Sequence, residues 1–158
     1  MPSKIATLVF FLMVPWCLSA QSIPADSSAL IKSEGAGMAR YAEVNGYPGP
    51  KHVLELQEEL QLDEDQAKQV EAIFDEMAEK ARDKGEEIIS AEVRLNALFV
   101  AKTADESSVE TLSAEIGRMR GELRAIHLSA HLQTAAVLST AQREQYTLLR
   151  REMSQHKH

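Results

Sequence analysis

The chain has 158 residues, with 17 Lys and Arg against 24 Asp and Glu, which gives a net charge of −7. This length supports one domain of ordinary size, and the composition excludes a collagen-like chain, a disulfide scaffold and a multidomain enzyme. The acidic balance argues against a nucleic-acid partner, which requires clustered Lys and Arg to displace counterions.

Residues 1–20 have the pattern of a cleaved signal peptide. Lys4 provides the positive charge, and residues 5–18 form an apolar run that is followed by small residues. The run is short for a membrane span, which needs about 20 apolar residues, and Pro15 interrupts it. Cleavage removes one positive charge and the single Cys17, so the mature chain has a net charge of −8 and no disulfide or Cys–zinc site.

Residues 21–45 are expected to be a flexible or partly helical segment, since they begin with small polar residues. A short helix over 36–44 would end at Asn45-Gly46, and the following Tyr-Pro-Gly-Pro breaks any helix. Residues 51–151 contain no Pro and only three Gly, which predicts an almost wholly helical region. The expected helices there are about 50–60, 64–99, 106–137 and 140–151.

Two long segments carry apolar residues at alternating steps of three and four, which places them on one stripe of a helix. The first stripe is Val70, Phe74, Met77, Ala81, Lys84, Ile88, Ala91, Leu95 and Leu98, and the second is Val109, Leu112, Ile116, Met119, Leu123, Ile126, Ala130, Gln133 and Val137. The short polar link at 101–107 predicts an antiparallel hairpin. Its first helix would be about 54 Å long, so one hairpin leaves apolar surface uncovered, and we expect a homodimer.

Two helix starts share one pattern, in which a Leu precedes a cap residue and a Gln follows three positions later. The residues are Leu62, Asp63 and Gln66 in the first and Leu138, Ser139 and Gln142 in the second. The cap side chain accepts from the backbone N–H three residues on, and the Gln reaches back to the N–H of the cap residue. A third helix start offers a box from Ser107 to Glu110, with Asp105 as a competing cap.

This pair of Leu-(Asp/Ser)-x-x-Gln motifs resembles the LTxxQ motif of the Spy/CpxP family, small exported helical proteins of Gram-negative periplasms. The related periplasmic heavy-metal sensor and zinc-responsive groups are similar. Asp63 and Ser139 stand where that family has Thr, and both remain good caps. The resemblance includes the Gly-Tyr-Pro-Gly-Pro segment that begins at Gly46. We therefore expect a helical domain over 46–152 and a disordered tail over 153–158.

The resemblance implies an all-α fold, a long antiparallel helical hairpin with short flanking helices in a cradle-like homodimer, located in the periplasm. It implies a chaperone without ATP or cofactor that binds unfolded or stressed proteins, with the LTxxQ motif as a structural cap. Apolar residues that remain exposed would form the client surface, with the candidates Ile73, Met77, Phe99, Leu128 and Leu132. A regulatory partner of a membrane sensor kinase is a further interpretation.

His127 and His131 are candidate metal ligands, because residues four apart share one helix face and two imidazoles can hold Zn, Ni or Cu. Metal binding or sensing is therefore the alternative function. Arg120 and Arg124 lie on the same stripe and disfavour a bound cation. A third ligand would come only through the fold, from His52, Glu122, His156 or His158. Otherwise the pair would form hydrogen bonds or face solvent.

The sequence offers no nucleophile constellation and no Gly-rich phosphate loop, so enzymatic activity is not expected. The many carboxylates of the first long segment fall largely outside its apolar stripe and are expected on a solvated helix face. They are Glu71, Asp75, Glu76, Glu79, Glu86, Glu87 and Glu92.

Overall fold

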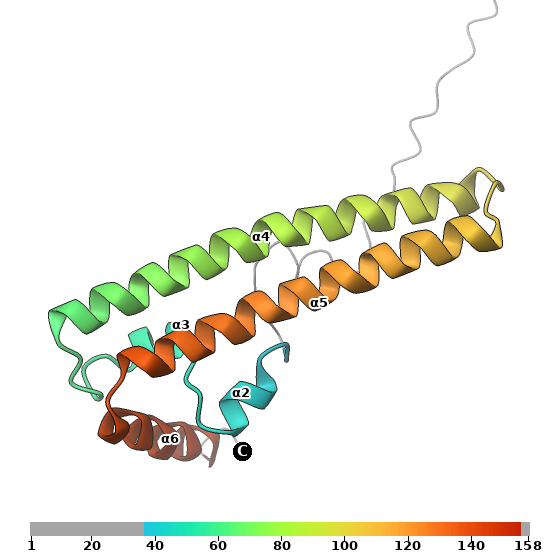
Figure 1. The fold of residues 1–158 in the computed structure, drawn as a ribbon. Helices are drawn as coiled ribbons and strands as arrows, with labels where there is room; N and C mark the ends of the chain where they lie inside the picture. The colour runs from blue at the N-terminus through green and yellow to red at the C-terminus, as the bar shows by residue number, and fades with distance from the viewer. Residues whose placement is uncertain (1–36, 156–158) are drawn as a thin grey trace, which may run out of the picture.

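The computed structural model describes residues 37–155, and all of its regular structure is helical. The helices are α2 (Arg40–Val44), α3 (Pro50–Glu55), α4 (Glu64–Val100), α5 (Glu106–Val137) and α6 (Thr140–Gln155). Figure 1 shows α4 and α5 as a long antiparallel hairpin, with the three shorter helices toward the end where α4 begins and α5 ends. The expected all-α hairpin with short flanking helices is confirmed. The expected signal peptide lies outside the described residues.

The long helices begin and end close to the positions that the sequence predicts. α5 has the predicted bounds, and α4 ends one residue later than predicted. α3 ends at Glu55 rather than 60, since the chain then turns to bury both Leu56 and Leu60 and reaches a positive φ of 50° at Gln61. α6 continues to Gln155, because no Pro or Gly interrupts it, so the first three residues of the expected tail are helical.

The middle of the hairpin is held by one buried apolar cluster. Its members all come from the two predicted stripes: Ala81, Ile88, Ala91, Ile116, Met119 and Leu123. Lys84, the polar member of the first stripe, is half-buried and places its Nζ 3.1 Å from Glu122 of α5. Arg120 of α5 similarly lies 2.9 Å from Glu92 of α4. Charged pairs therefore join the two long helices beside the apolar seam.

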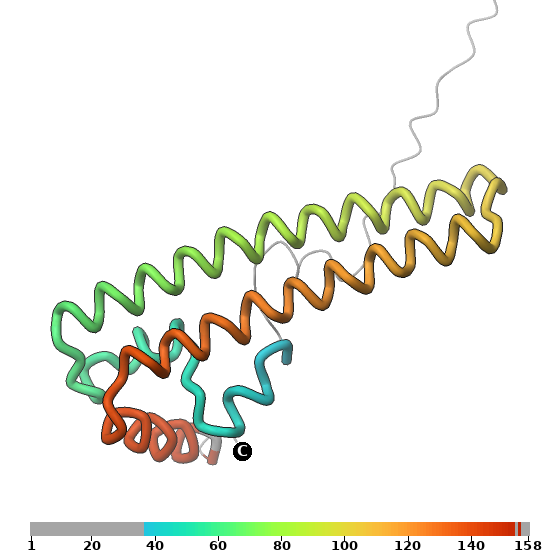
Figure 2. Tube along the Cα trace, in the orientation of Figure 1, coloured from blue at the N-terminus to red at the C-terminus, as the bar shows by residue number. Residues whose placement is uncertain are grey.

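A second buried cluster closes the end of the hairpin where the short helices meet, which we call the base. It consists of Val53, Leu56, Leu60, Val70, Leu138 and Tyr146, with Leu62 packed against it. Figure 2 shows how the chain returns there, since α6 follows the end of α5 and lies near α3 and the start of α4. Both Leu residues that precede the predicted caps therefore anchor their helices in this cluster.

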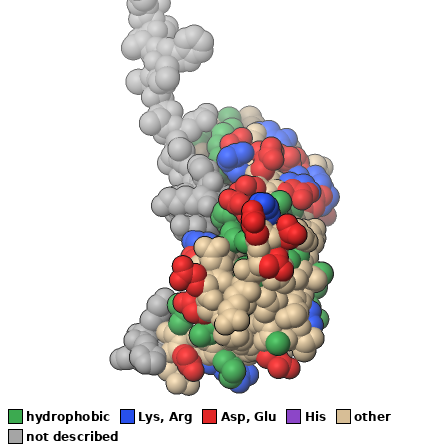
Figure 3. All heavy atoms as spheres, turned by 90° about the vertical axis from the view of Figure 1, so that its left-hand side faces the viewer, with side chains coloured by type: hydrophobic (Ala, Val, Ile, Leu, Met, Phe, Trp, Pro, Cys, Tyr) green, Lys and Arg blue, Asp and Glu red, His purple; other side chains and the backbone are tan. Residues whose placement is uncertain are grey.

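The surface is rich in charge of both signs. Figure 3, which views the base end-on, shows acidic and basic side chains interspersed with apolar ones. Six of the seven carboxylates expected on a solvated face are exposed, while Glu92 is half-buried against Arg120. Over residues 37–155, the structure contains no helix with both the length and the apolar character required to cross a bilayer.

Candidate functional site

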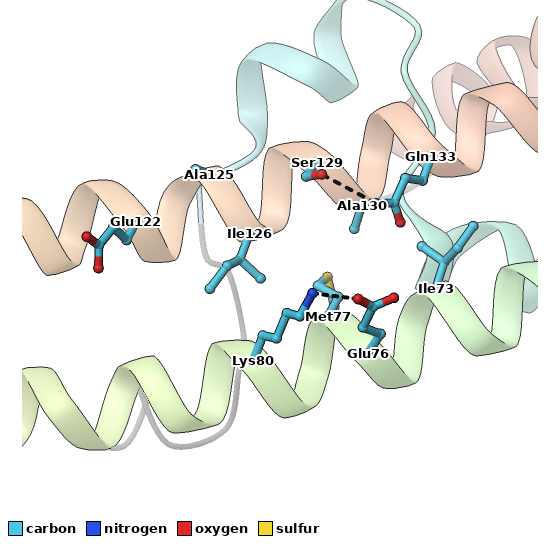
Figure 4. A pocket seen from close by; sticks show the side chains of 10 residues that line it. All are labelled: Ile73, Glu76, Met77, Lys80, Glu122, Ala125, Ile126, Ser129, Ala130 and Gln133. Carbon is cyan, nitrogen blue, oxygen red and sulfur yellow. Dashed lines mark hydrogen bonds and ion pairs between the residues drawn. The ribbon is translucent and has the colours of Figure 1, made fainter.

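A groove of about 310 Å³ lies between α4 and α5. Figure 4 shows Met77 of α4 and Ile126 of α5 projecting into the space between the two helices. Ile73 adds a further apolar side chain, and all three are half-buried. The charged pair of Lys80 with Glu76 lies at the edge of the groove. The groove is therefore apolar inside and carries both signs of charge at its rim.

The five candidate client-binding residues do not form one surface. Ile73 and Met77 line the groove. Phe99 is 57% exposed at the far end of the hairpin, which we call the tip, and Leu132 is 58% exposed on α5. Leu128 is half-buried on α5 and does not line the groove. Only the first two therefore share a recess in which an apolar segment could be enclosed.

His127 and His131 lie side by side on α5 and are both buried, with 6% of each residue exposed. His131 Nδ1 is 2.8 Å from the carbonyl oxygen of Tyr47. Because a carbonyl only accepts, Nδ1 carries the proton, and Nε2 keeps its lone pair when the ring is neutral. Burial, reinforced by the nearby His131, lowers the pKa of His127, so its ring is held neutral. The sequence predicts that the histidines either form hydrogen bonds or face solvent; His131 forms a hydrogen bond, and neither residue faces solvent.

The two arginines of the same stripe are engaged by other helices. Arg120 lies 2.9 Å from Glu92 of α4. Arg124 stacks on the ring of Tyr41 of α2, with 5.2 Å from its Cζ to the ring centroid. Arg120 therefore has a carboxylate beside it, which reduces the positive potential that the sequence predicts around His127.

The donor set around the imidazole pair is incomplete within the described part of the chain. No group of three His, Cys, Asp or Glu residues in 37–155 is placed to hold a metal ion. His52 is engaged elsewhere, since its Nδ1 lies 3.1 Å from Glu43, and this hydrogen bond lowers the pKa of Glu43. Catalytic zinc takes three protein ligands and structural zinc four. His127 and His131 alone are therefore fewer donors than either kind of zinc site requires.

The two predicted capping motifs are formed and also contact each other. The Asp63 carboxylate accepts from the Gln66 N–H at 2.7 Å, and Ser139 Oγ accepts from the Gln142 N–H at 3.2 Å. Gln66 Nε2 donates to Gln142 Oε1 at 3.0 Å, and Gln142 Nε2 donates back to Gln66 Oε1 at 2.9 Å. The Gln66 amide also donates to the backbone carbonyl of Val137, and the Gln142 amide donates to that of Leu60. The motifs form one structural junction at the base.

Sequence reasoning missed the contact of His131 with the Tyr-Pro-Gly-Pro turn. A Cβ on Gly49 would lie 2.9 Å from Cε1 and 3.1 Å from Nε2 of the His131 ring, too close for any side chain. The residues of this segment predict a helix break, and spacing alone gives no indication of a partner 84 residues away. The buried hydroxyl of Tyr146, which has no hydrogen-bond partner among the described residues, also had no sequence signal.

Comparison with known proteins gives one match. A family model described as heavy-metal resistance matches residues 35–145, which is more than half of the chain and spans α2 to the first part of α6. No curated protein and no solved structure matches the chain significantly.

Proposed function

The chain belongs to the heavy-metal resistance family, within the Spy/CpxP-like helical proteins, and from this premise we propose that it binds unfolded or stressed proteins without ATP. The groove between α4 and α5 carries this proposal, because two predicted client-binding residues, Ile73 and Met77, line it together. We place the protein in the periplasm after removal of residues 1–20, where proteins damaged by metal stress would be its clients.

The chemistry of the groove suits segments of varied sequence. Its volume of about 310 Å³ is at the small end of ligand clefts, so it accommodates side chains of an extended segment rather than a folded domain. Met77 is unbranched and adapts to different apolar shapes. The rim carries Lys80 together with Glu76 and Glu122, so charges of either sign that flank an apolar segment find a partner. These features support binding that is apolar but not sequence-specific.

The client surface would be completed by a second copy of the chain. Leu132 and the tip residues Phe99 and Val100 are large apolar side chains that are more than half exposed. A homodimer would cover part of this surface and enlarge the area open to clients. Sedimentation velocity at micromolar concentration should give twice the mass of the chain that begins at Gln21. A clean monomer would contradict the cradle-like arrangement.

An aggregation assay tests the groove. The purified chain should suppress aggregation of a thermally unfolded client with and without chelator. The double variant Ile73→Asp with Met77→Asp should lose most of this suppression, because it charges the groove. The matched control, Val44→Asp with Leu148→Asp, places the same charges on exposed apolar positions outside the groove and should retain it. Loss of suppression in the control alone would overturn the assignment of the groove.

A regulatory partnership with a membrane sensor kinase remains the distinct alternative among protein-binding functions. The kinase partnership would be favoured if the parent chain pulled down one specific membrane protein and if the Ile73→Asp and Met77→Asp substitutions did not affect this binding. Release of that partner by unfolded client protein would instead join the two functions at one surface.

Metal binding is the second candidate, and the buried imidazole pair favours it. His127 would bind through a ring nitrogen and His131 through Nε2, whose orientation the Tyr47 carbonyl sets by holding Nδ1–H. A bound Zn, Ni or Cu ion would cross-link the two rings. We expect weak binding from the described residues alone, because they supply two ligands.

Titration calorimetry separates this candidate from adventitious binding. The parent should carry His156→Ala and His158→Ala, which remove the C-terminal imidazoles. Binding should weaken as pH falls, because only neutral imidazole binds metal, and protonation of His127 should require a pH below the ordinary histidine pKa of about 6.5, since burial lowers its pKa. Metal binding would be the primary function if the parent bound with sub-micromolar affinity, and if His127→Ala with His131→Ala abolished this binding while His52→Ala did not.

A further inference from the structure

The apolar seam between α4 and α5 is open over one stretch, which lies between the two buried clusters. Toward the tip, the cluster that contains Ala81 closes the seam, and toward the base, the cluster that contains Val70 closes it. Between these clusters, the stripe residues Phe74 and Met77 of α4 are only half-buried, as is Ile126 of α5. The groove therefore lies between two well-packed regions that hold its walls in place.

Two residues of α5 explain why the seam is open here. Ala130 and Gln133 belong to the second apolar stripe, whose other members are Val, Leu, Ile or Met. The methyl group of Ala130 is buried but small, and Gln133 is exposed, so neither fills the space beside Ile73 and Met77. Lys84, the polar member of the other stripe, forms ion pairs. Gln133 has no comparable role in the fold.

The side-chain amide of Gln133 is available to a ligand. Among residues 37–155 it makes one hydrogen bond, a long one of 3.5 Å from Nε2 to Ser129 Oγ. The oxygen Oε1 and the second N–H of Nε2 therefore have no partner in the described part of the chain. Figure 4 shows the side chain of Gln133 extending from α5 toward α4, on the side of Ile73. The groove thus has a neutral donor and acceptor beside its apolar interior.

The charged residues that line the groove are already paired. Lys80 bonds Glu76 of the same helix. Glu122 is paired with Lys84 of α4 at 3.1 Å and with Arg118 of its own helix. No lining residue therefore offers an unpaired charge that would select an ionic ligand. The neutral complement of an amide that donates and accepts is another amide, and an unfolded protein presents one at each peptide bond.

The length of the groove suits a short stretch of extended chain. From Ile73 to Lys80 it follows α4 for about 10 Å, at about 1.5 Å per residue. An extended chain advances about 3.3 Å per residue, so about three residues span the groove. A segment of this length places a peptide group near Gln133 while an apolar side chain contacts Met77 and Ile126. The bound segment also excludes water from the Gln133 amide, which strengthens a hydrogen bond there.

We propose that the Gln133 amide hydrogen-bonds the main chain of the segment that occupies the groove, so that the groove selects extended polypeptide over other apolar ligands. This inference deepens the proposed client-binding function and rests on it. Because the peptide group is common to all residues, a main-chain hydrogen bond contributes affinity that does not depend on the client sequence. Ile73 and Met77 supply the apolar contact, and Gln133 determines the class of ligand.

Fluorescence anisotropy of a labelled peptide tests the role of Gln133. The probe is a soluble peptide in which Leu-Val-Leu is flanked by Ser and Gly, and the protein is the chain that begins at Gln21. Gln133→Ala should weaken binding about five-fold, the effect of losing one hydrogen bond in a partly enclosed site. Gln133→Leu should weaken binding similarly, because leucine retains the bulk of the side chain but has no amide. Asn96→Ala is the matched control, since it removes an exposed amide of α4 about 24 Å along the helix from Lys80, and it should leave the affinity unchanged.

Ester replacements in the probe test the main-chain contact directly. An ester replaces one peptide N–H with oxygen and leaves all side chains of the probe unchanged. In the parent, an ester at one position of the Leu-Val-Leu segment should weaken binding about five-fold. In Gln133→Ala the same ester should have no further effect, because the partner of that peptide group is already absent. A purely structural role of Gln133 would not produce this coupling.

The outcomes separate this inference from the proposed function. The inference is overturned, and the client groove stands, if Ile73→Asp with Met77→Asp abolishes peptide binding while both Gln133 variants bind as the parent does. Additive effects of the ester and Gln133→Ala would also overturn the inference. If the parent does not bind the probe, or if the Ile73→Asp and Met77→Asp variant binds it equally well, the proposed function of the groove fails and the inference fails with it.

Discussion

The base and the tip of the α4–α5 hairpin begin helices with the same kind of cap but differ in what surrounds it. At the tip, Asp105 accepts from the Ser108 N–H at 2.8 Å and from its hydroxyl at 2.9 Å, all within one turn. At the base, the caps at Asp63 and Ser139 are joined through the paired amides of Gln66 and Gln142. The cap at the tip bonds only within its own helix turn. The caps at the base are connected through Gln66 and Gln142, which are 76 residues apart in the sequence.

The apolar residues at the two ends differ in the same way. Leu60 is 1% exposed in the base cluster, whereas Phe99 and Val100 at the tip are 57% and 72% exposed. Within residues 37–155, no third helix covers the tip (Figure 1). The comparison shows that a helix-start motif indicates where a helix begins, while its contribution to stability depends on the elements packed around it.

The largest expected difference between the two ends is in core packing. Leu60→Ala should cost about 3 kcal/mol in the free energy of unfolding, since it removes a fully buried side chain from the base cluster. Phe99→Ala should cost less than about 1 kcal/mol, because its side chain is mostly in water. Urea unfolding followed by circular dichroism measures both. Equal costs would show that the tip is buried in the assembly in solution.

The paired amides should give the next largest effect. Gln66→Ala or Gln142→Ala should each cost about 2 kcal/mol, because the remaining amide and a backbone carbonyl lose partners in a part-buried site. A double-mutant cycle in urea should show coupling on the order of 1 kcal/mol. Gln133→Ala is the control, since its amide is exposed and bonds only Ser129 at 3.5 Å. Additive losses would contradict direct coupling of the motifs.

A single cap at the base should have a smaller effect. Ser139→Ala should cost about 1 kcal/mol, because the Gln142 N–H loses its acceptor. Suppression of client aggregation should be retained, since the cap lies outside the groove. Ser113→Ala, at an exposed position inside α5, should not destabilise the chain. Loss of suppression at unchanged stability would give the motif a direct functional role.

The smallest effect concerns acid. Hydrogen bonds from the Ser108 N–H and hydroxyl hold the pKa of Asp105 below its usual 3.8. The unfolded chain therefore binds this proton first as pH falls, so the stabilisation is complete above pH 3.8 and disappears as pH falls through the lower folded pKa. The Ser139 cap has no charge to lose. The Ser108 amide shift should titrate with Asp105 in NMR spectra, and Asp105→Asn should abolish that titration.

Much of the hairpin was predictable because its signals are local and repeated. The apolar stripes of α4 and α5 extend over many turns, and tertiary packing selects the same faces that the pattern indicates. The end of α3 was less predictable, because burial of Leu56 and Leu60 overrides the helical tendency of residues 56–60. Of the candidate site, the spacing indicated that His127 and His131 share a face but not that Tyr47 and Gly49 cover them.

The positions of the helix caps and the antiparallel pairing of α4 with α5 follow from short-range hydrogen bonding and helical periodicity, which are written into neighbouring residues. The meeting of Gln66 with Gln142 and the burial of His131 beneath Tyr47 were decided by the fold alone. Such contacts join residues 76 and 84 positions apart, and no local pattern encodes them. They form because packing of the short helices on the hairpin brings the two amide side chains together and places the His131 ring at the Tyr47 carbonyl.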